Sequence, residues 1–75
     1  MRILAIDQGT SSTKALVVED GLVVSQASVP VRPAYLSDGR VEQDPQELLH
    51  SVIHAGTSAM AASGPVDAVA LANQG

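Results

Sequence analysis

The sequence predicts an α/β fold in which a mixed β-sheet carries a helix on one face. Three successive β-type runs are joined by short turns, a capped helical segment follows them, and a further apolar run comes after the helix. A strand that is reached through a helical crossover lies parallel to its neighbour in the sheet. We therefore expect the order βββαβ, with the last strand parallel to a strand of the first three.

The first three strands are expected to form an antiparallel meander. Apolar or β-branched runs occupy residues 3–6, 13–19 and 22–29. The first run ends at Asp7, and the Gly and hydroxyl residues of 8–12 predict a turn. Asp20 and Gly21, between the second and third runs, are typical of a two-residue hairpin. Residues 31–43 are expected to be a loop with a turn at its Asp-Gly pair, residues 38–39.

A helix is predicted over residues 45–63, followed by a strand over 66–72. Asp44 is a favoured N-cap, Pro45 occupies the preferred first helical position, and Glu47 completes a pattern like a capping box. A Gly-Pro pair at residues 64–65 ends the helix. The side chains expected to face the sheet are Leu48, Leu49, Val52, Ile53, Ala59 and Met60.

The opposite side of this helix carries His50 and His54, whose four-residue spacing can bind a metal. No third ligand is nearby in the sequence, so we interpret both as solvent-exposed residues of the polar face. Glu42 and Asp44 could form a catalytic carboxylate pair. We favour Asp44 as the N-cap and leave the role of Glu42 open.

Composition excludes several classes of protein. The chain has 75 residues, eight acidic and four basic side chains and a net charge of −4, and the basic residues are scattered, so we expect no nucleic-acid partner. It has no cysteine, which excludes a disulfide framework and fits a reducing compartment. No stretch is apolar enough for a signal peptide or a membrane span, so we expect a cytoplasmic protein with no membrane partner.

Residues 7–14, Asp-Gln-Gly-Thr-Ser-Ser-Thr-Lys, carry the candidate chemistry. Gly9 permits a tight turn, and the hydroxyl and backbone N–H groups of residues 10–13 suit phosphate oxygens. Lys14 adds a positive charge, and Asp7 stands where it could hold Mg²⁺, directly or through water. The same residue types are also ordinary turn formers, so composition alone leaves a plain loop equally open. Neither the P-loop nor the dinucleotide-binding glycine pattern is present.

Three motifs resemble the FGGY family of carbohydrate kinases. Residues 6–14 look like its first phosphate-binding signature, residues 41–45 (Val-Glu-Gln-Asp-Pro) are similar to its Glu-x-Asp-Pro, and residues 72–74 are similar to its Asn-Gln. They occur in the family's order, and the resemblance covers essentially the whole chain. The Asp-x-Gly-Thr/Ser hairpin is shared with the wider superfamily that includes actin and the 70-kDa heat-shock chaperones.

The resemblance implies a ribonuclease H-like fold, of which residues 1–75 are a truncated βββαβ portion of the N-terminal domain without the second domain. It implies an ATP-dependent kinase that phosphorylates a sugar or polyol, with ATP and Mg²⁺ as cofactors and Asp7 placing the metal. The implied nucleotide-phosphate contacts are Gly9, Thr10, Ser11, Ser12 and Lys14. Gln74 and Gly75 would lie near the substrate, and a homodimer is the assembly suggested for the parent protein.

The general base and the adenosine pocket of such kinases lie in the second domain, so no catalytic residue is expected in this chain. Glycerol kinases follow Asn-Gln with Arg-Glu, whereas this chain has Gly75, which favours a larger sugar than glycerol. Two alternatives stay open. One is an actin- or chaperone-like nucleotide-binding module, and the other is a catalytically inactive fragment.

Overall fold

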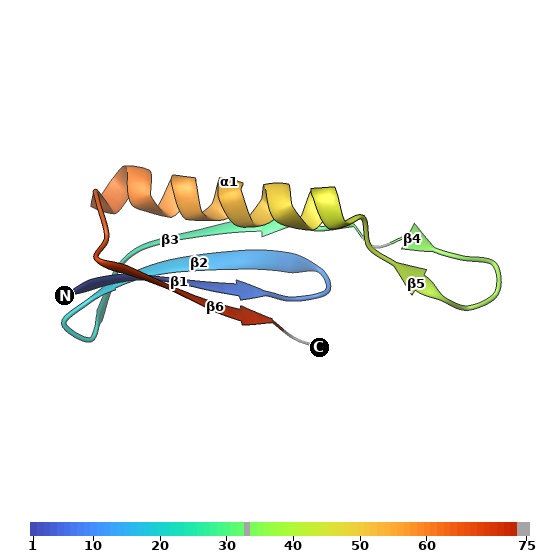
Figure 1. The fold of residues 1–75 in the computed structure, drawn as a ribbon, viewed down its shortest axis with the longest axis horizontal. Helices are drawn as coiled ribbons and strands as arrows, with labels where there is room; N and C mark the ends of the chain where they lie inside the picture. The colour runs from blue at the N-terminus through green and yellow to red at the C-terminus, as the bar shows by residue number, and fades with distance from the viewer. Residues whose placement is uncertain (33, 74–75) are drawn as a thin grey trace.

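The computed structural model describes residues 1–32 and 34–73, which fold into a mixed sheet with one helix across it (Figure 1). The elements are β1 (Arg2–Gln8), β2 (Ser12–Glu19), β3 (Leu22–Pro30), β4 (Ala34–Tyr35), β5 (Val41–Glu42), α1 (Pro45–Ser63) and β6 (Ala68–Asn73). The main sheet has four strands in the order β3-β2-β1-β6. This arrangement confirms the α/β prediction and the helix on one face.

The pairing of the strands also confirms the predicted meander and crossover. β1 pairs with β2 and β2 with β3 in antiparallel fashion, whereas β6 lies parallel to β1. Asp20 and Gly21 both have positive φ angles, 52° and 83°, as a tight two-residue hairpin requires. The last strand begins at Ala68 rather than at residue 66, and the preceding Asp67 donates its N–H to the carbonyl of Arg2 at 2.8 Å.

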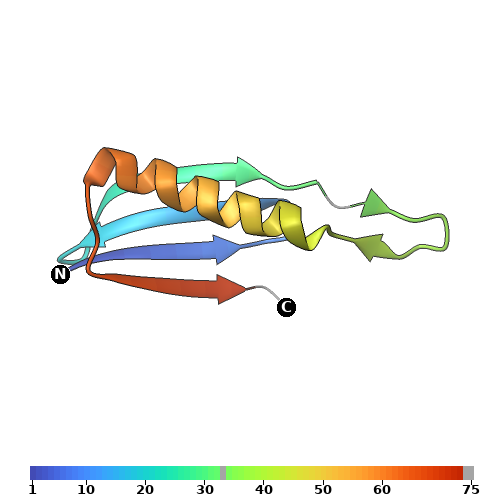
Figure 2. The same ribbon diagram turned by 45° about the horizontal axis from the view of Figure 1, so that its top comes forward.

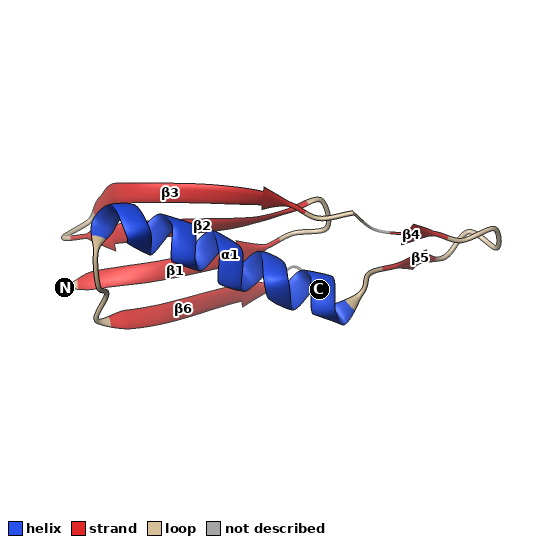
Figure 3. Cartoon of the chain, turned by 90° about the horizontal axis from the view of Figure 1, so that it is seen from above, coloured by secondary structure: helices blue, strands red, loops and turns tan. Residues whose placement is uncertain are grey.

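The core lies between α1 and strands β1, β2 and β3. Its buried apolar members are Leu4, Ile6, Ala15, Val17, Ala55 and Ala59. Small residues on the helix allow a close approach to the sheet, and a Cβ added at Gly56 would stand 3.4 Å from the side chains of both Leu4 and Ile6. The helix lies diagonally over the sheet (Figure 3).

The predicted buried stripe of α1 is wrong at two positions. Leu49 and Ile53 are 57% and 56% exposed, while the helix buries Ser51, Ala55, Gly56 and Ala59 instead. Close packing favours the face with the smallest side chains, so the helix is rotated and these two bulky side chains stand on its flank. His50 and His54 are exposed, as predicted.

The strand β6 extends beside the helix rather than beneath it (Figure 2). Val69 and Leu71 pair in register with the buried Leu4 and Ile6, and neighbours in a sheet share one side. They nevertheless remain 60% and 67% exposed. An apolar surface is therefore left open on the helix-bearing side of the sheet.

The ends of α1 are fixed by side-chain and backbone contacts. The Asp44 carboxylate accepts a hydrogen bond of 2.9 Å from the N–H of Gln46, which confirms the N-cap. At the other end Gly64, with φ 88°, donates its N–H to Met60 at 2.7 Å. The expected capping box is wrong, because the Glu47 carboxylate accepts from the N–H of Arg32 at 3.0 Å. That N–H follows the end of β3 and finds its partner on the helix.

Arg2, to which the sequence assigned no structural role, joins the first strand to the end of the helix. Its guanidinium donates to the carbonyl of Ser63 at 2.7 Å and to the carboxylate of Glu19 at 3.0 Å. A cation at a helix C-terminus is favourable because the last carbonyls carry partial negative charge. This contact holds the C-terminal end of α1 over the start of β1.

The expected loop over residues 31–43 contains a short hairpin that the sequence analysis missed. Strands β4 and β5 pair Ala34 with Glu42 and Tyr35 with Val41, and they project beyond the main sheet (Figure 1). The expected turn at residues 38–39 is confirmed by a hydrogen bond of 3.1 Å from the N–H of Gly39 to the carbonyl of Leu36. With only two residues in each strand, this hairpin was too short for a periodic pattern to reveal.

A buried pair of hydroxyls joins β2 to α1, and it supports a stability prediction. The side-chain oxygens of Thr13 and Ser51 lie 2.7 Å apart, with the residues only 0% and 4% exposed. Ser51 also donates to the carbonyl of Leu48 at 2.7 Å. Its one proton is therefore used there, so Thr13 must be the donor in the Thr13–Ser51 contact.

Replacing Ser51 with alanine is expected to destabilise the protein more than replacing Thr13 with valine. Ser51→Ala leaves the Thr13 donor buried without a partner, at a cost of about 1–3 kcal/mol. Thr13→Val removes that donor, and Ser51 keeps its bond to Leu48. Urea unfolding of the two variants measures the difference, and an equal or larger loss for Thr13→Val would refute the assigned direction of the hydrogen bond.

Candidate functional site

The candidate site lies at the β1–β2 turn, residues 9–12, on the edge of the sheet where parallel strands β1 and β6 both end. Asn73, the last residue of β6, is in register with Gln8 of β1. Ligands of open α/β sheets bind outside the carboxyl ends of the parallel strands. Helix α1 begins at the same edge, where the Gln8 amide donates to the carbonyl of Leu48 at 3.4 Å. The topology therefore brings the turn, two strand ends and a helix start together.

Asp7 and Lys14 lie side by side on the face of the sheet that does not carry α1. They are directly opposite each other in the β1–β2 ladder, and opposite residues share one side of a sheet. Ile6, which precedes Asp7, is buried beneath the helix, so the alternation of the strand turns Asp7 the other way. Both charged residues are exposed. Within the described residues neither takes part in an ion pair.

A polar hollow of about 170 Å³ adjoins these two residues. It is lined by Asp7, Gly9, Thr10, Ser11, Ser12 and Lys14. The structure thus brings together the residues that the resemblance implied for nucleotide phosphate and metal, but not Thr13. Pockets that enclose whole small molecules start at about 300 Å³. The hollow therefore has room for phosphate groups but not for an entire nucleotide.

Asp7 supplies the carboxylate of this hollow. Mg²⁺ is usually held by one or two carboxylates together with substrate phosphates and several waters. A single carboxylate beside a group of phosphate donors fits that pattern, so Asp7 is the residue that would hold a Mg²⁺ ion here. Among the described residues there is no cluster of three or more His, Cys, Asp or Glu side chains that could form an all-protein metal site.

Three carbonyls of the turn point back into the protein. The carbonyl of Ser12 accepts from the N–H of Gly9, and that of Ser11 accepts from the N–H of Val31, both at 2.9 Å. The carbonyl of Thr10 accepts from the side-chain amide of Gln43 at 2.9 Å. The sequence analysis quoted Gln43 only as part of a motif and gave it no role. Its position next to the N-cap was the available signal, because it places the residue at the same edge as the turn.

The expectation that Thr13 offers its hydroxyl to a ligand is wrong. Thr13 is completely buried on the helix side of the sheet, where it meets Ser51. Side chains alternate along a strand, so residues 12 and 14 face the side of the sheet without the helix and residue 13 faces the core. The hydroxyls that line the hollow are those of Thr10, Ser11 and Ser12.

An apolar groove of about 240 Å³ continues from the hollow along the face of the sheet that does not carry α1. It shares Asp7 and Lys14 with the hollow, and its other lining residues are Ala5, Ile6, Leu16, Ala70, Leu71 and Ala72. The alanines of β1 and β6 leave this face shallow and smooth. The polar hollow is therefore bordered by a surface that suits close packing.

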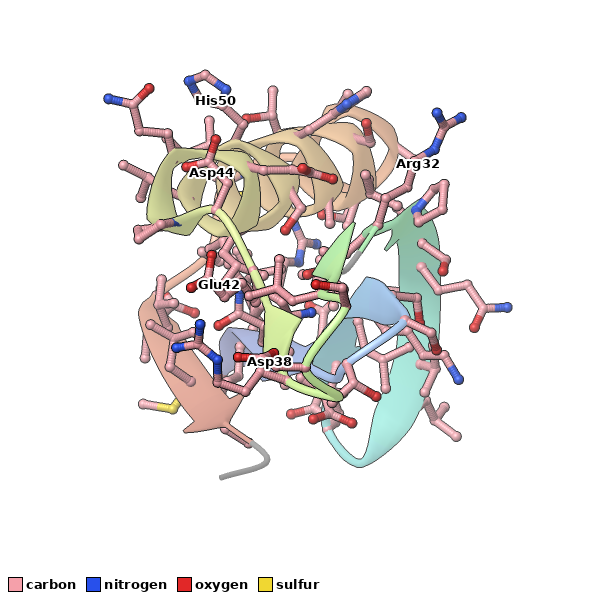
Figure 4. The ribbon with its side chains drawn as sticks, turned by 90° about the vertical axis from the view of Figure 1, so that its right-hand side faces the viewer. Arg32, Asp38, Glu42, Asp44 and His50 are labelled. Carbon is pink, nitrogen blue, oxygen red and sulfur yellow. The ribbon has the colours of Figure 1, made fainter. Side chains whose placement is uncertain are left out.

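The remaining candidates lie away from the hollow. Asp44 caps α1, and Glu42 is an exposed residue of β5 that does not line the hollow. Both are labelled in the end-on view (Figure 4). His50 points from the outer side of the helix in the same view. The predicted substrate-proximal residues, Gln74 and Gly75, lie outside the described residues. The single helix in the described part of the chain is not long and apolar enough to cross a membrane.

Comparisons with known proteins show which sequences this chain resembles. The chain is 39% identical to glycerol kinase from Verminephrobacter eiseniae over 77 aligned residues, which cover 96% of this chain and 15% of that protein. It is 35% identical to glycerol kinase 1 from Thermotoga maritima, with 99% of this chain and 16% of that protein covered. It is 38% identical to glycerol kinase from Acidovorax sp., with 96% and 16% covered.

The chain therefore spans about one sixth of the length of these curated relatives. Residues 2–75 also match the sequence profile of the FGGY family of carbohydrate kinases, N-terminal domain. The match runs through the β1–β2 turn, the capped helix and β6, which are the elements that build the candidate site. The chain belongs to the FGGY family of carbohydrate kinases.

Proposed function

We propose that the full-length protein transfers the γ-phosphoryl group of ATP to a hydroxyl of a sugar or polyol. Residues 1–75 would supply the first phosphate-binding hairpin of that kinase. The observation that carries the proposal is the polar hollow, in which Asp7 and Lys14 flank the Gly and hydroxyl residues of 9–12. Membership of a carbohydrate kinase family makes phosphates the natural ligand of such a hollow.

Each residue of the hollow has a chemical role in this proposal. The hydroxyls of Thr10, Ser11 and Ser12 and the backbone N–H groups of the turn donate to phosphate oxygens, while Gly9 lets the phosphates approach the main chain. Lys14 offsets phosphate charge. Asp7 holds Mg²⁺, directly or through water, and the bound ion would neutralise the charge that develops during transfer. Rate enhancement then comes from positioning and electrostatics.

We further propose that residues 1–75 form the opening part of a larger ribonuclease H-like domain. The supporting observation is the exposure of large apolar side chains, Leu49 and Ile53 on the flank of α1 and Val69 and Leu71 on the helix-bearing side of β6. Large exposed apolar patches generally mark contact surfaces. The general base and the adenosine pocket would come from a second domain, so these 75 residues alone are expected to be inactive. The full-length protein is proposed to be a cytoplasmic homodimer.

The acceptor is proposed to be larger than glycerol, although the relatives compared above are named glycerol kinases. This chain has Gly75 where glycerol kinases have an arginine, and a glycine leaves space and removes a charged, hydrogen-bonding fork. The space left by the absent arginine side chain suits an acceptor with a longer carbon chain.

The experiment that tests this proposal is ADP release by the full-length protein with ATP, Mg²⁺ and a panel of acceptors. The panel includes glycerol, tetritols, pentitols, ketopentoses and hexoses. We expect strong acceptor-dependent turnover with a pentose or larger polyol and weak turnover with glycerol. Glycerol as the best acceptor would refute the size argument. Steady ATP hydrolysis that no acceptor stimulates would instead indicate an actin- or chaperone-like module.

A further inference from the structure

The peptide unit between Thr10 and Ser11 is held by a side chain from outside the turn. The Gln43 amide nitrogen donates to the Thr10 carbonyl oxygen at 2.9 Å, across 33 positions of sequence. A peptide bond is planar and trans, so its carbonyl and the following N–H point in opposite directions. Whatever fixes the Thr10 carbonyl therefore also fixes the direction of the Ser11 N–H.

The two ends of this peptide unit point in opposite directions. Gln43 immediately precedes the N-cap of α1 and does not line the hollow, so the Thr10 carbonyl is bonded to a group outside it. Asp7 and Lys14 stand on the face of the sheet that does not carry α1, and Ser11 lines the hollow with them. With its carbonyl drawn towards Gln43, the peptide directs the Ser11 N–H towards the hollow. Among the described residues none accepts a hydrogen bond from this N–H.

The other carbonyls of the turn are bonded to backbone N–H groups, those of Gly9 and Val31. Such bonds are insensitive to the identity of the side chain. Gln43 alone among these donors can be altered by substitution. Its contact is also exposed, so it adds little to global stability compared with a buried hydrogen bond.

We propose that Gln43 is a positioning residue that presets the Ser11 N–H to receive a phosphate oxygen of ATP. The inference rests on the proposed kinase function, because the ligand it names is the nucleotide phosphate. Gln43 does not touch the phosphate. It acts by holding the Thr10–Ser11 peptide in one orientation, so that the donor needs no rearrangement when ATP binds.

The test is Gln43→Met in the full-length protein, which keeps the length of the side chain and removes its donor. Gln46→Met is the matched control, because Gln46 is an exposed glutamine three residues further on whose side chain has no hydrogen bond to the described residues. Measurements are the KM for ATP, the KM for the acceptor, the Kd for ATP by calorimetry, the urea midpoint and the NMR order parameter of the Ser11 amide.

We expect Gln43→Met to raise the KM and the Kd for ATP by about tenfold, the usual effect of losing one well-placed hydrogen bond. The KM for the acceptor and the urea midpoint should stay at wild-type values, while the NMR order parameter of the Ser11 amide falls because its peptide is no longer held. Gln46→Met should match the wild type throughout.

Two results would overturn the proposal. One is an unchanged ATP affinity in Gln43→Met, and the other is a parallel loss of ATP affinity, acceptor affinity and stability, which would mark Gln43 as a general structural residue. Failure of the wild-type protein to bind ATP would refute the proposed function rather than the role of Gln43. In that case an unchanged order parameter of the Ser11 amide in Gln43→Met would still refute the peptide-positioning step.

Discussion

If the full-length protein is the proposed kinase, Asp7→Ala is expected to lower its kcat by about a thousandfold or more, the scale at which a metal or oxyanion stabiliser is lost. The carboxylate of Asp7 stands at the end of a rigid strand, it lines the polar hollow, and it is not used in an ion pair within the described residues. Removing it takes away the proposed Mg²⁺ ligand. Acceptor binding should survive, because the residues proposed to lie near the acceptor, Gln74 and Gly75, do not include Asp7.

The measurement combines steady-state kinetics across a Mg²⁺ titration with acceptor binding by calorimetry. Asp38→Ala provides the matched control, because Asp38 is an exposed carboxylate on the β4–β5 turn that contacts Arg40 and lies outside the hollow. That variant should show wild-type kinetics. Near-normal turnover of Asp7→Ala would eliminate the metal-placing role proposed for this residue.

Lys14→Met is expected to raise the KM for ATP by about 10–100-fold, because a hydrogen bond to a charged group contributes about 1.5–3 kcal/mol. Lys14 stands opposite Asp7 in the ladder and reaches the same hollow, where its ammonium group would offset phosphate charge. Its side chain is exposed and makes no ion pair with the described residues, so folding should be unaffected.

Lys14→Arg separates charge from geometry in the same assay. Arginine keeps the positive charge but presents a planar fork in place of a compact ammonium, so we expect it to retain most of the ATP affinity with a smaller loss in kcat. If Lys14→Met binds ATP as the wild type does at low and at high salt, Lys14 has no role in phosphate binding.

Local signals were sufficient to predict most of the fold. The Asp20-Gly21 turn, the Asp44 N-cap and the glycine that ends α1 each act within a few residues, and all three were confirmed. The parallel insertion of β6 follows from the general behaviour of helical crossovers. The residues that line the polar hollow are contiguous or nearly so, and a single tight turn brings them together.

The errors share a different cause. A helical wheel reports where apolar residues gather, but it does not say how closely the helix approaches the sheet. Here the small residues Ala55 and Ala59 take the buried face, which leaves Leu49 and Ile53 on the flank. Glu47 likewise follows the capping-box pattern, yet its carboxylate accepts a hydrogen bond from the backbone N–H of Arg32 instead of capping the helix.

The sequence by itself determined the order of the four main strands and the helix, the turn between Asp7 and Lys14, and the family. These depend on short-range backbone preferences and on contiguous motifs. Only the tertiary structure decided that Thr13 faces the core and that the Gln43 amide donates a hydrogen bond to the Thr10 carbonyl. Both depend on how α1 is placed against the sheet, and that placement results from packing between residues more than 30 positions apart.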